Sequence, residues 1–248
     1  MAQNTPKRMR APEAEQRAWR MSRAAENYLL SLAILQEDGV SPHVSELASY
    51  LRRIPPGEEV GTTLASVSGM VQRMAKEGLV RITKEKAIVL TSEGHARARD
   101  VVRRHRLSER LLVDVLDVPI ERAESLAHQL EHAISPELLG CIEAKLDFPE
   151  TCPYGRPIYR EGDQEIRGDQ HGSIRLSDAK PGQRYTILRI PDEDYSLLNY
   201  LVESDIIPAR EIMVNDIATY RGVVDIQRDT IHISLGMEVA ARIMIKKA

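Results

Sequence analysis

The order of elements expected in the first third of the chain places the strongest constraint on the fold. Apolar residues recur at helical spacing over 21–37, 44–51 and 64–77, which predicts three helices. Glycines and prolines separate these segments, and Gly78 is well placed to end the third helix. The segment 79–91 then predicts two short strands around a polar turn. Three helices followed by a β-hairpin is the element order of a winged helix-turn-helix.

The distribution of charge favours a polyanionic partner for this region. Residues 1–110 contain 19 Lys or Arg and 13 Asp or Glu, whereas residues 111–248 contain 15 and 24. A winged helix-turn-helix places its third helix in the major groove of DNA and its hairpin against phosphates. We therefore predict binding to double-stranded DNA through outward positions of these elements, with an ordinary solvated surface as the alternative for each basic residue. The positions are Ser66, Ser68, Gly69, Arg73, Arg81, Lys84 and Lys86.

A second group of residues has the composition of a metal site. His128, Glu131 and His132 stand at positions i, i+3 and i+4, so they share one face of a helix expected over 120–133. Further candidate ligands stand one turn earlier and on an upstream helix: Glu124, His105 and Glu109. Taken alone, residues 128–132 are H-x-x-E-H, the signature of a class of zinc peptidases.

The peptidase is the alternative function. It would use Glu131 to activate a metal-bound water and would need a third ligand from downstream. It leaves a DNA-reading domain unexplained, and nothing around the motif suggests a substrate cleft. We therefore expect no enzymatic activity and no small-molecule substrate.

The segment 92–147 predicts three further helices, separated by Pro119 and Pro136. Their apolar faces lie outside the first domain and need a partner, which predicts a homodimer. A symmetric dimer would present two third helices to a two-fold operator. No run of 18 apolar residues exists, so no membrane span is expected. Two cysteines in 248 residues make no disulfide framework and favour a reducing cytoplasm.

Several stretches together resemble a known family. They are AENYLLSLAILQEDGV, RMAKEGLV, LTSEGHARARDVVRRHRLSERLL, AHQLEHAIS and CPYGRPI, which cover about residues 21–157. In this order and spacing they are similar to the iron-dependent repressors of the diphtheria toxin repressor type, with the manganese transport regulators as relatives. The resemblance implies a repressor that binds palindromic operator DNA as a homodimer when loaded with metal, and that controls metal-ion homeostasis.

The resemblance also implies two metal sites. The primary site would take Asn27, where relatives have Met or Asp, and His128, where relatives have Cys or Glu. Its other ligands would be Glu131 and His132. The second site would take His105, Glu109, Glu124 and the weakly aligned Asp194. Two alternatives stay open: Asn27 could face solvent, and the metal could be purely structural.

The ligand set leaves the metal open. Sulfur ligands favour iron and additional carboxylates favour manganese, but Asn27 and His128 are neither. The resemblance implies Fe(II) first and Mn(II) next, whereas imidazole-rich sites also suit Zn(II), Co(II) or Ni(II).

Two features of the first domain depart from the family. Residues 52–63 form a much longer connection than the tight turn of relatives. A tolerated surface insertion is one interpretation, and a phosphate contact through Arg52 and Arg53 is the other. Gly69 stands where the toxin repressor carries a base-contacting Gln, which would leave more specificity to DNA shape.

The last part of the chain changes character. Short alternating runs over 171–248 predict a small barrel, which resembles the SH3-like domain of the family and the FeoA domain of iron transport proteins. We thus expect an α+β multidomain protein made of a winged helix-turn-helix, a helical dimerisation domain and a small SH3-like β-barrel. The expected divisions are a disordered basic tail (1–20), the DNA-binding domain (21–93), the dimerisation and metal-binding domain (94–157), a polar linker (158–170) and the barrel (171–248).

Overall fold

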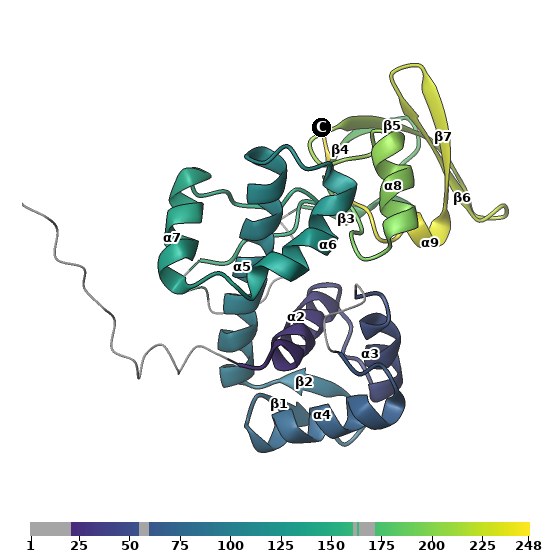
Figure 1. Cartoon of the computed structure of the whole chain (residues 1–248). Helices are drawn as coiled ribbons and strands as arrows, with labels where there is room; N and C mark the ends of the chain where they lie inside the picture. The colour runs from purple at the N-terminus through teal and green to yellow at the C-terminus, as the bar shows by residue number, and fades with distance from the viewer. Residues whose placement is uncertain (1–20, 55–59, 161–162, 164–171) are drawn as a thin grey trace, which may run out of the picture.

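The computed structural model describes residues 21–54, 60–160, 163 and 172–248. These residues form three groups of elements: an N-terminal domain at the bottom of Figure 1, a helical domain at its upper left and a C-terminal sheet domain at its upper right. The tail expected over 1–20, the centre of the 52–63 connection and most of the expected linker lie outside the described residues.

The N-terminal domain confirms the predicted element order. It consists of α2 (Arg23–Glu37), α3 (Val44–Leu51), α4 (Leu64–Lys76), β1 (Val80–Ile82) and β2 (Ile88–Leu90). The side chains of Ser22 and Thr63 cap α2 and α4 by accepting backbone N–H hydrogen bonds. Gly78 has a φ of 75°, a conformation that costs glycine little, and it ends α4 as predicted. One apolar core joins the three helices to the hairpin, so α4 is held with one face outward.

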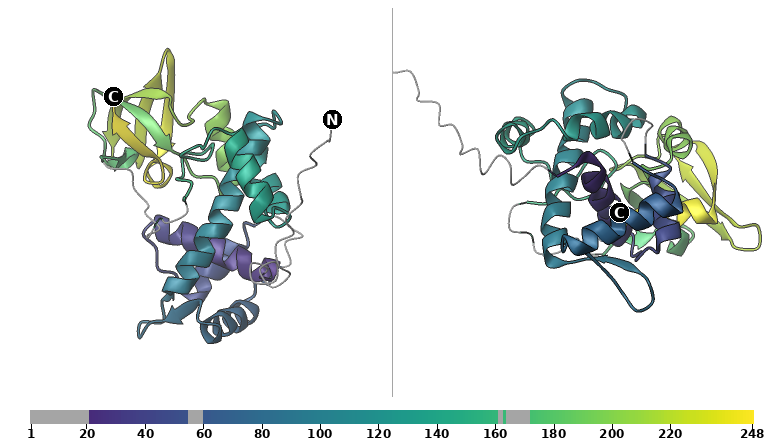
Figure 2. Two further views of the ribbon diagram at one scale, coloured as in Figure 1. Left: turned by 90° about the vertical axis from the view of Figure 1, so that its left-hand side faces the viewer. Right: turned by 60° about the horizontal axis from the view of Figure 1, so that its bottom comes forward.

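Helix α5 (Ser92–Asp114) belongs to two domains. Its first half contributes Ala98, Val101 and Val102 to the core of the N-terminal domain, whereas Leu107 packs in the helical domain. The left view of Figure 2 shows this helix running from one domain into the other. The boundary expected at residue 93/94 therefore falls inside a continuous helix that both domains share.

The helical domain is completed by α6 (Ile120–Glu131) and α7 (Pro136–Lys145). Pro119 precedes α6, and Ser135 caps α7 with Pro136 in its first turn. The end of the domain continues past residue 157, because Ile158 joins its core and Tyr159 packs in the N-terminal core. These two residues are buried, so the expected linker does not begin at 158.

The C-terminal domain is a six-stranded antiparallel sheet that curls around one apolar core, as expected for a small barrel (Figure 2). Its strand order is β3-β8-β4-β5-β6-β7, so the last strand lies between the first two. The strands are β3 (Ile174–Arg175), β4 (Gln183–Arg189), β5 (Glu211–Ala218), β6 (Val223–Arg228), β7 (Ile231–Gly236) and β8 (Met244–Lys247). The sheet is accompanied by the 3-10 turn η1 (Leu176–Asp178) and the helices α8 (Tyr195–Glu203) and α9 (Met237–Ala240). Helix α8 packs beside α6, which brings the sheet domain against the helical domain.

None of the described helices combines the length and the apolar composition that crossing a membrane requires.

Candidate metal centre

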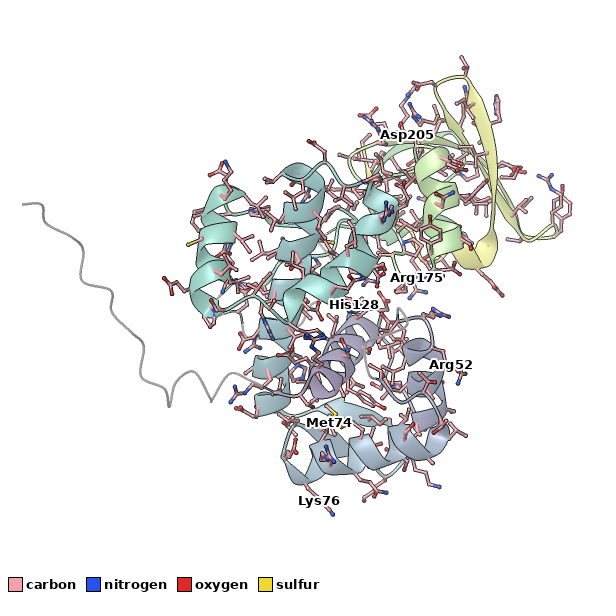
Figure 3. All side chains as sticks on the ribbon, in the orientation of Figure 1. Arg52, Met74, Lys76, His128, Arg175 and Asp205 are labelled. Atoms are coloured by element: carbon pink, nitrogen blue, oxygen red, sulfur yellow. The ribbon has the colours of Figure 1, made fainter. Side chains whose placement is uncertain are left out.

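The predicted primary ligands gather in the interior, between α2, α5 and α6. Helix α6 presents His128 and Glu131, and His132 follows as its C-cap residue. Helix α2 presents Asn27, which is fully buried and therefore does not face solvent. The side chains of His128, Glu131 and His132 are 5%, 1% and 2% exposed. Figure 3 shows His128 at the junction of the N-terminal and helical domains.

One nitrogen of each of two histidines faces the same oxygen of Glu131. Glu131 Oε1 lies 3.7 Å from His128 Nδ1 and 3.5 Å from His132 Nε2. Two ligands at neighbouring corners of a tetrahedron with metal–ligand distances of about 2.1 Å are separated by about 3.4 Å. His128 Nδ1 and Glu131 Oε1 are buried and form no hydrogen bond with any described residue. The residues fit a divalent ion, because buried polar atoms without hydrogen bonds are rare unless they serve another ligand.

Each histidine is oriented by a carboxylate on its other nitrogen. His128 Nε2 lies 3.1 Å from Glu124 Oε1. His132 Nδ1 lies 2.5 Å from Glu26 Oε2 and donates to it. Metal-binding histidines are usually held in this way, which fixes the tautomer and the ring orientation. The arrangement therefore directs one nitrogen of each ring toward Glu131.

The sequence prediction missed Glu26. This side chain is buried on α2 and also accepts a hydrogen bond of 2.7 Å from Arg104 on α5. The local pattern indicates only burial, because Glu26 stands three and four residues before Leu29 and Leu30 on a stripe that faces the core, and it does not reveal the histidine partner. Glu26 belongs to the N-terminal domain and His132 to the helical domain, so their hydrogen bond joins the two.

Glu131 links the primary site to the predicted second site. Its Oε2 lies 2.5 Å from His105 Nδ1, and His105 Nε2 lies 2.9 Å from Glu109 Oε1. Both ring nitrogens of His105 therefore face carboxylates. Ligand atoms of His105, His128 and Glu131 all lie within 4.8 Å of one another, so His105 could also join a metal site with these two residues.

The charges of this cluster compensate one another. Burial alone would lower the pKa of His128, but the neighbouring carboxylates of Glu124 and Glu131 outweigh it and raise the pKa to about 9. Burial alone would raise the pKa of Glu131, but the neighbouring His105 and His128 hold it well below its usual range. Protons on His105 and His128, whose pKa values are raised, thus balance the carboxylates as a divalent cation could, and metal binding would release them.

The structure places Asp194 away from this cluster. Its exposed carboxylate caps α8 by accepting a hydrogen bond from the backbone N–H of Leu197. Asp192 and Glu193 instead line a cavity of about 20 Å³ together with His105, Glu124 and His128. Such a volume holds one water molecule or ion. Two carboxyl groups of the sheet domain therefore lie next to the predicted second site.

Two family descriptions match the chain. Residues 91–160 match "Iron dependent repressor, metal binding and dimerisation domain", and residues 174–247 match "FeoA domain". The iron-dependent repressor IdeR of Mycobacterium leprae is 30% identical over 198 residues, which cover 76% of this chain and 82% of that protein. The chain belongs to the iron-dependent repressor family.

Two further comparisons support membership of the iron-dependent repressor family. The diphtheria toxin repressor of Corynebacterium efficiens is 31% identical over 184 residues, which cover 70% of this chain and 76% of that protein. A solved structure described as a manganese-dependent transcriptional repressor in complex with manganese superposes with a TM-score of 0.77 at 28% identity. The superposition covers 90% of this chain and 100% of the chain in that structure. The family and the fold class predicted from the sequence are confirmed.

The residues predicted to contact DNA lie on α4 and on the β1–β2 hairpin. Most of the predicted contact residues are exposed, and only Ser68 is half-buried; they are Ser66, Gly69, Arg73, Arg81, Lys84 and Lys86. The two arginines at the start of the 52–63 connection differ. Arg52 is exposed and donates to Ser49, whereas Arg53 lines a cleft that faces the FeoA domain. Residues 55–59 lie outside the described part of the chain.

Proposed function

We propose that this member of the iron-dependent repressor family is a metal-dependent transcriptional repressor that binds operator DNA as a homodimer. One observation supports this most directly: groups from two domains meet at the candidate metal centre. Asn27 and Glu26 belong to α2, which shares an apolar core with α4, whereas Glu131 and His132 belong to the helical domain. An ion held at this junction fixes the orientation of the DNA-reading domain.

In the proposed site, some residues bind the ion and others orient the ligands. His128, Glu131 and His132 hold the ion, with Asn27 as the fourth ligand. Glu124 and Glu26 orient the two imidazoles from outside. The bound ion supplies positive charge that attracts all of these donors at once. Metal that favours the DNA-competent orientation raises operator affinity, and operator DNA tightens metal binding by the same factor.

A homodimer is supported by exposed apolar side chains on the helical domain. Val115, Leu116 and Leu138 are 38%, 57% and 47% exposed. A second copy covers this surface and places two α4 helices on a palindromic operator. Sedimentation of the full chain measures the state directly. A monomer at concentrations that bind operator would contradict the dimer.

Fe(II) is the proposed metal and Mn(II) the second candidate. Both fit the nitrogen and oxygen donors of Asn27, His128, Glu131 and His132, as do Zn(II), Co(II) and Ni(II). Titration with the five metals, followed by binding to an operator fragment, ranks them.

The function is tested with His132→Ala. We expect wild-type operator affinity to rise about 10-fold or more with saturating Mn(II) or Fe(II), and the variant to lose this rise. His232→Ala, an exposed change in the FeoA domain, serves as the matched control. An unchanged metal response in His132→Ala contradicts the proposal. Circular dichroism after chelation separates a further alternative, because a purely structural metal would leave the protein unfolded when it is removed.

A further inference from the structure

A wide cleft separates the N-terminal domain from the FeoA domain. Its volume is about 590 Å³, and it lies between the end of α2, α3 and the sheet. It is distinct from the small cavity beside the histidines, whose volume is about 20 Å³. Five arginines line it: Arg53, Arg156, Arg175, Arg189 and Arg242. Three carboxylates do so as well: Glu37, Asp38 and Glu193. The wall is therefore cationic.

Most of the negative charge in this wall is already engaged by one arginine. Arg156 is buried and reaches Glu37 Oε2 at 3.3 Å, Asp38 Oδ1 at 3.2 Å and Glu193 Oε1 at 2.9 Å. Arg242 shares Glu193, at 2.6 Å. The carboxylates are thus divided among several guanidinium groups and cannot neutralise all of them.

Arg189 is a buried cation with few partners among the described residues. Its side chain is 10% exposed, and its one ion pair in the described chain is with Asp38, at 3.2 Å from Nη1. That Nη1 is buried and makes no hydrogen bond of good geometry with a described residue. Burial and the neighbouring charge of Arg156 lower the pKa of Arg189 by more than Asp38, Glu37 and Asp192 raise it, so the nearby carboxylates do not offset the cost of burying this second guanidinium. An additional anion would offset this cost.

Two more arginines of the cleft have no carboxylate partner within the described residues. Arg53 follows α3 and Arg175 ends β3, so they face the cleft from the two domains, and both are exposed. Figure 3 shows Arg175 between the N-terminal domain and the FeoA domain, whereas Lys76 on α4 lies at the far edge of the molecule. The Arg175 side of the cleft is therefore well separated from Lys76 at the end of α4.

We propose that this cleft binds a small polyanion through phosphate or carboxylate groups, with Arg175 and Arg189 as its principal ligands. The planar guanidinium fork pairs with either group through two parallel hydrogen bonds. The cleft volume falls in the range of small-molecule sites, which is about 300–1,000 Å³. The site is independent of the proposed metal switch, because its residues are separate from the candidate metal ligands.

The proposal is tested by calorimetric titration of inorganic phosphate into the full chain after chelator treatment, at constant ionic strength. We expect saturable binding that weakens by roughly 10-fold in Arg175→Gln and in Arg189→Gln. Arg184→Gln removes an exposed arginine of β4 that does not line the cleft, and it should leave the affinity unchanged. Arg175 is exposed, so its variant is informative even if Arg189→Gln fails to fold.

Succinate in place of phosphate identifies the preferred oxyanion, and saturable binding of either one that depends on Arg175 supports the proposal. Two results would overturn it. One is the absence of saturable binding for both anions, or equal binding in the two cleft variants and the wild type. The other is displacement of phosphate by a short DNA duplex in the wild type, because the arginines would then belong to a DNA interface.

Discussion

Glu131 uses its two oxygens for different purposes. Oε1 faces His128 and His132 at the candidate metal centre, whereas Oε2 contacts His105 on α5. A change at this carboxylate would disturb the predicted primary and second sites together. The roles of Glu26 and Glu124 are narrower, since each orients one imidazole.

Glu26→Gln is expected to weaken metal binding by about 10- to 100-fold, because an amide holds the His132 ring and its tautomer less firmly than a carboxylate does. Competition with a fluorescent chelator measures the Mn(II) affinity. Glu77→Gln changes an exposed residue of the same domain and should leave it unaltered. Equal affinities of Glu26→Gln and the wild type would show that Glu26 only pairs with Arg104.

The sequence was least informative about which individual residues lie near the histidines. The spacing of His128, Glu131 and His132 predicted a shared helix face, because helical geometry is local. Glu26 and Asp192 could not be found in this way, since their proximity to the histidines depends on how three separate elements pack. The expectation for Asp194 shows the same limit. Asp192 is buried, whereas Asp194, two residues later in the same loop, caps α8.

At the scale of elements, the hairpin and α5 approach each other unusually closely. A Cβ atom on Gly94 would lie 1.9 Å from the carbonyl oxygen of Leu79, which is a severe clash with the backbone. The glycine therefore sets the distance between the first turn of α5 and the base of the hairpin. Positions such as this depend on tertiary packing, so a sequence without an alignment does not reveal them.

Gly94→Ala is expected to lower the free energy of unfolding by about 2 kcal/mol or more, because the backbone of β1 or α5 must shift. Gly69→Ala on α4 is the matched change in the same domain. A Cβ there meets nothing within 4 Å, so alanine should raise stability by about 0.5–1 kcal/mol through helix propensity. Urea denaturation of both variants, without DNA, compares the effects. A neutral Gly94→Ala would mean that the helix and hairpin are not tightly held.

The element order itself was predictable. Helix caps, glycine stops and apolar periodicity each depend on residues that are close together in the sequence. From these signals the predicted bounds of α2, α4 and α7 come close to the observed ones. The sharing of α5 between two cores was not predictable, because nothing in a continuous helical pattern marks which domain each turn packs against.

At the scale of the whole molecule, the three domains meet around Glu37 at the end of α2. Its carboxylate is buried and accepts hydrogen bonds from Arg106 of the helical domain, Tyr159 and Arg156. Arg156 in turn reaches Asp192 of the FeoA domain, at 3.1 Å. Helix α2 is thus fixed near its start by the candidate metal centre and at its end by this network.

Glu37→Gln is expected to lower the free energy of unfolding at pH 7 by about 3–5 kcal/mol, because it leaves buried arginines without their partner. Burial alone would raise the pKa of Glu37, but Arg106 and Arg156 lower it below its ordinary value of 4.5. The stability that the charged form contributes is therefore present above that value and is lost as the pH falls through the lower, folded-state pKa.

Urea denaturation between pH 7 and pH 3 measures this dependence. The wild type should lose stability on acidification below about pH 4.5, and Glu37→Gln should show a flatter profile. Glu93→Gln removes an exposed partner of Arg97 and should cost less than about 1 kcal/mol. Parallel pH profiles for the wild type and Glu37→Gln would contradict the assignment.

The strand order of the FeoA domain has a consequence for synthesis on the ribosome. The hairpin of the N-terminal domain pairs residues that are ten positions apart, Val80 with Leu90. In the FeoA domain, β8 pairs with β3 and β4 on its two sides, and Ile174 faces Ile245. This sheet can therefore close only after residues 244–247 have left the exit tunnel. The N-terminal domain can fold first, and the arginine-lined cleft forms only once β8 has joined the sheet.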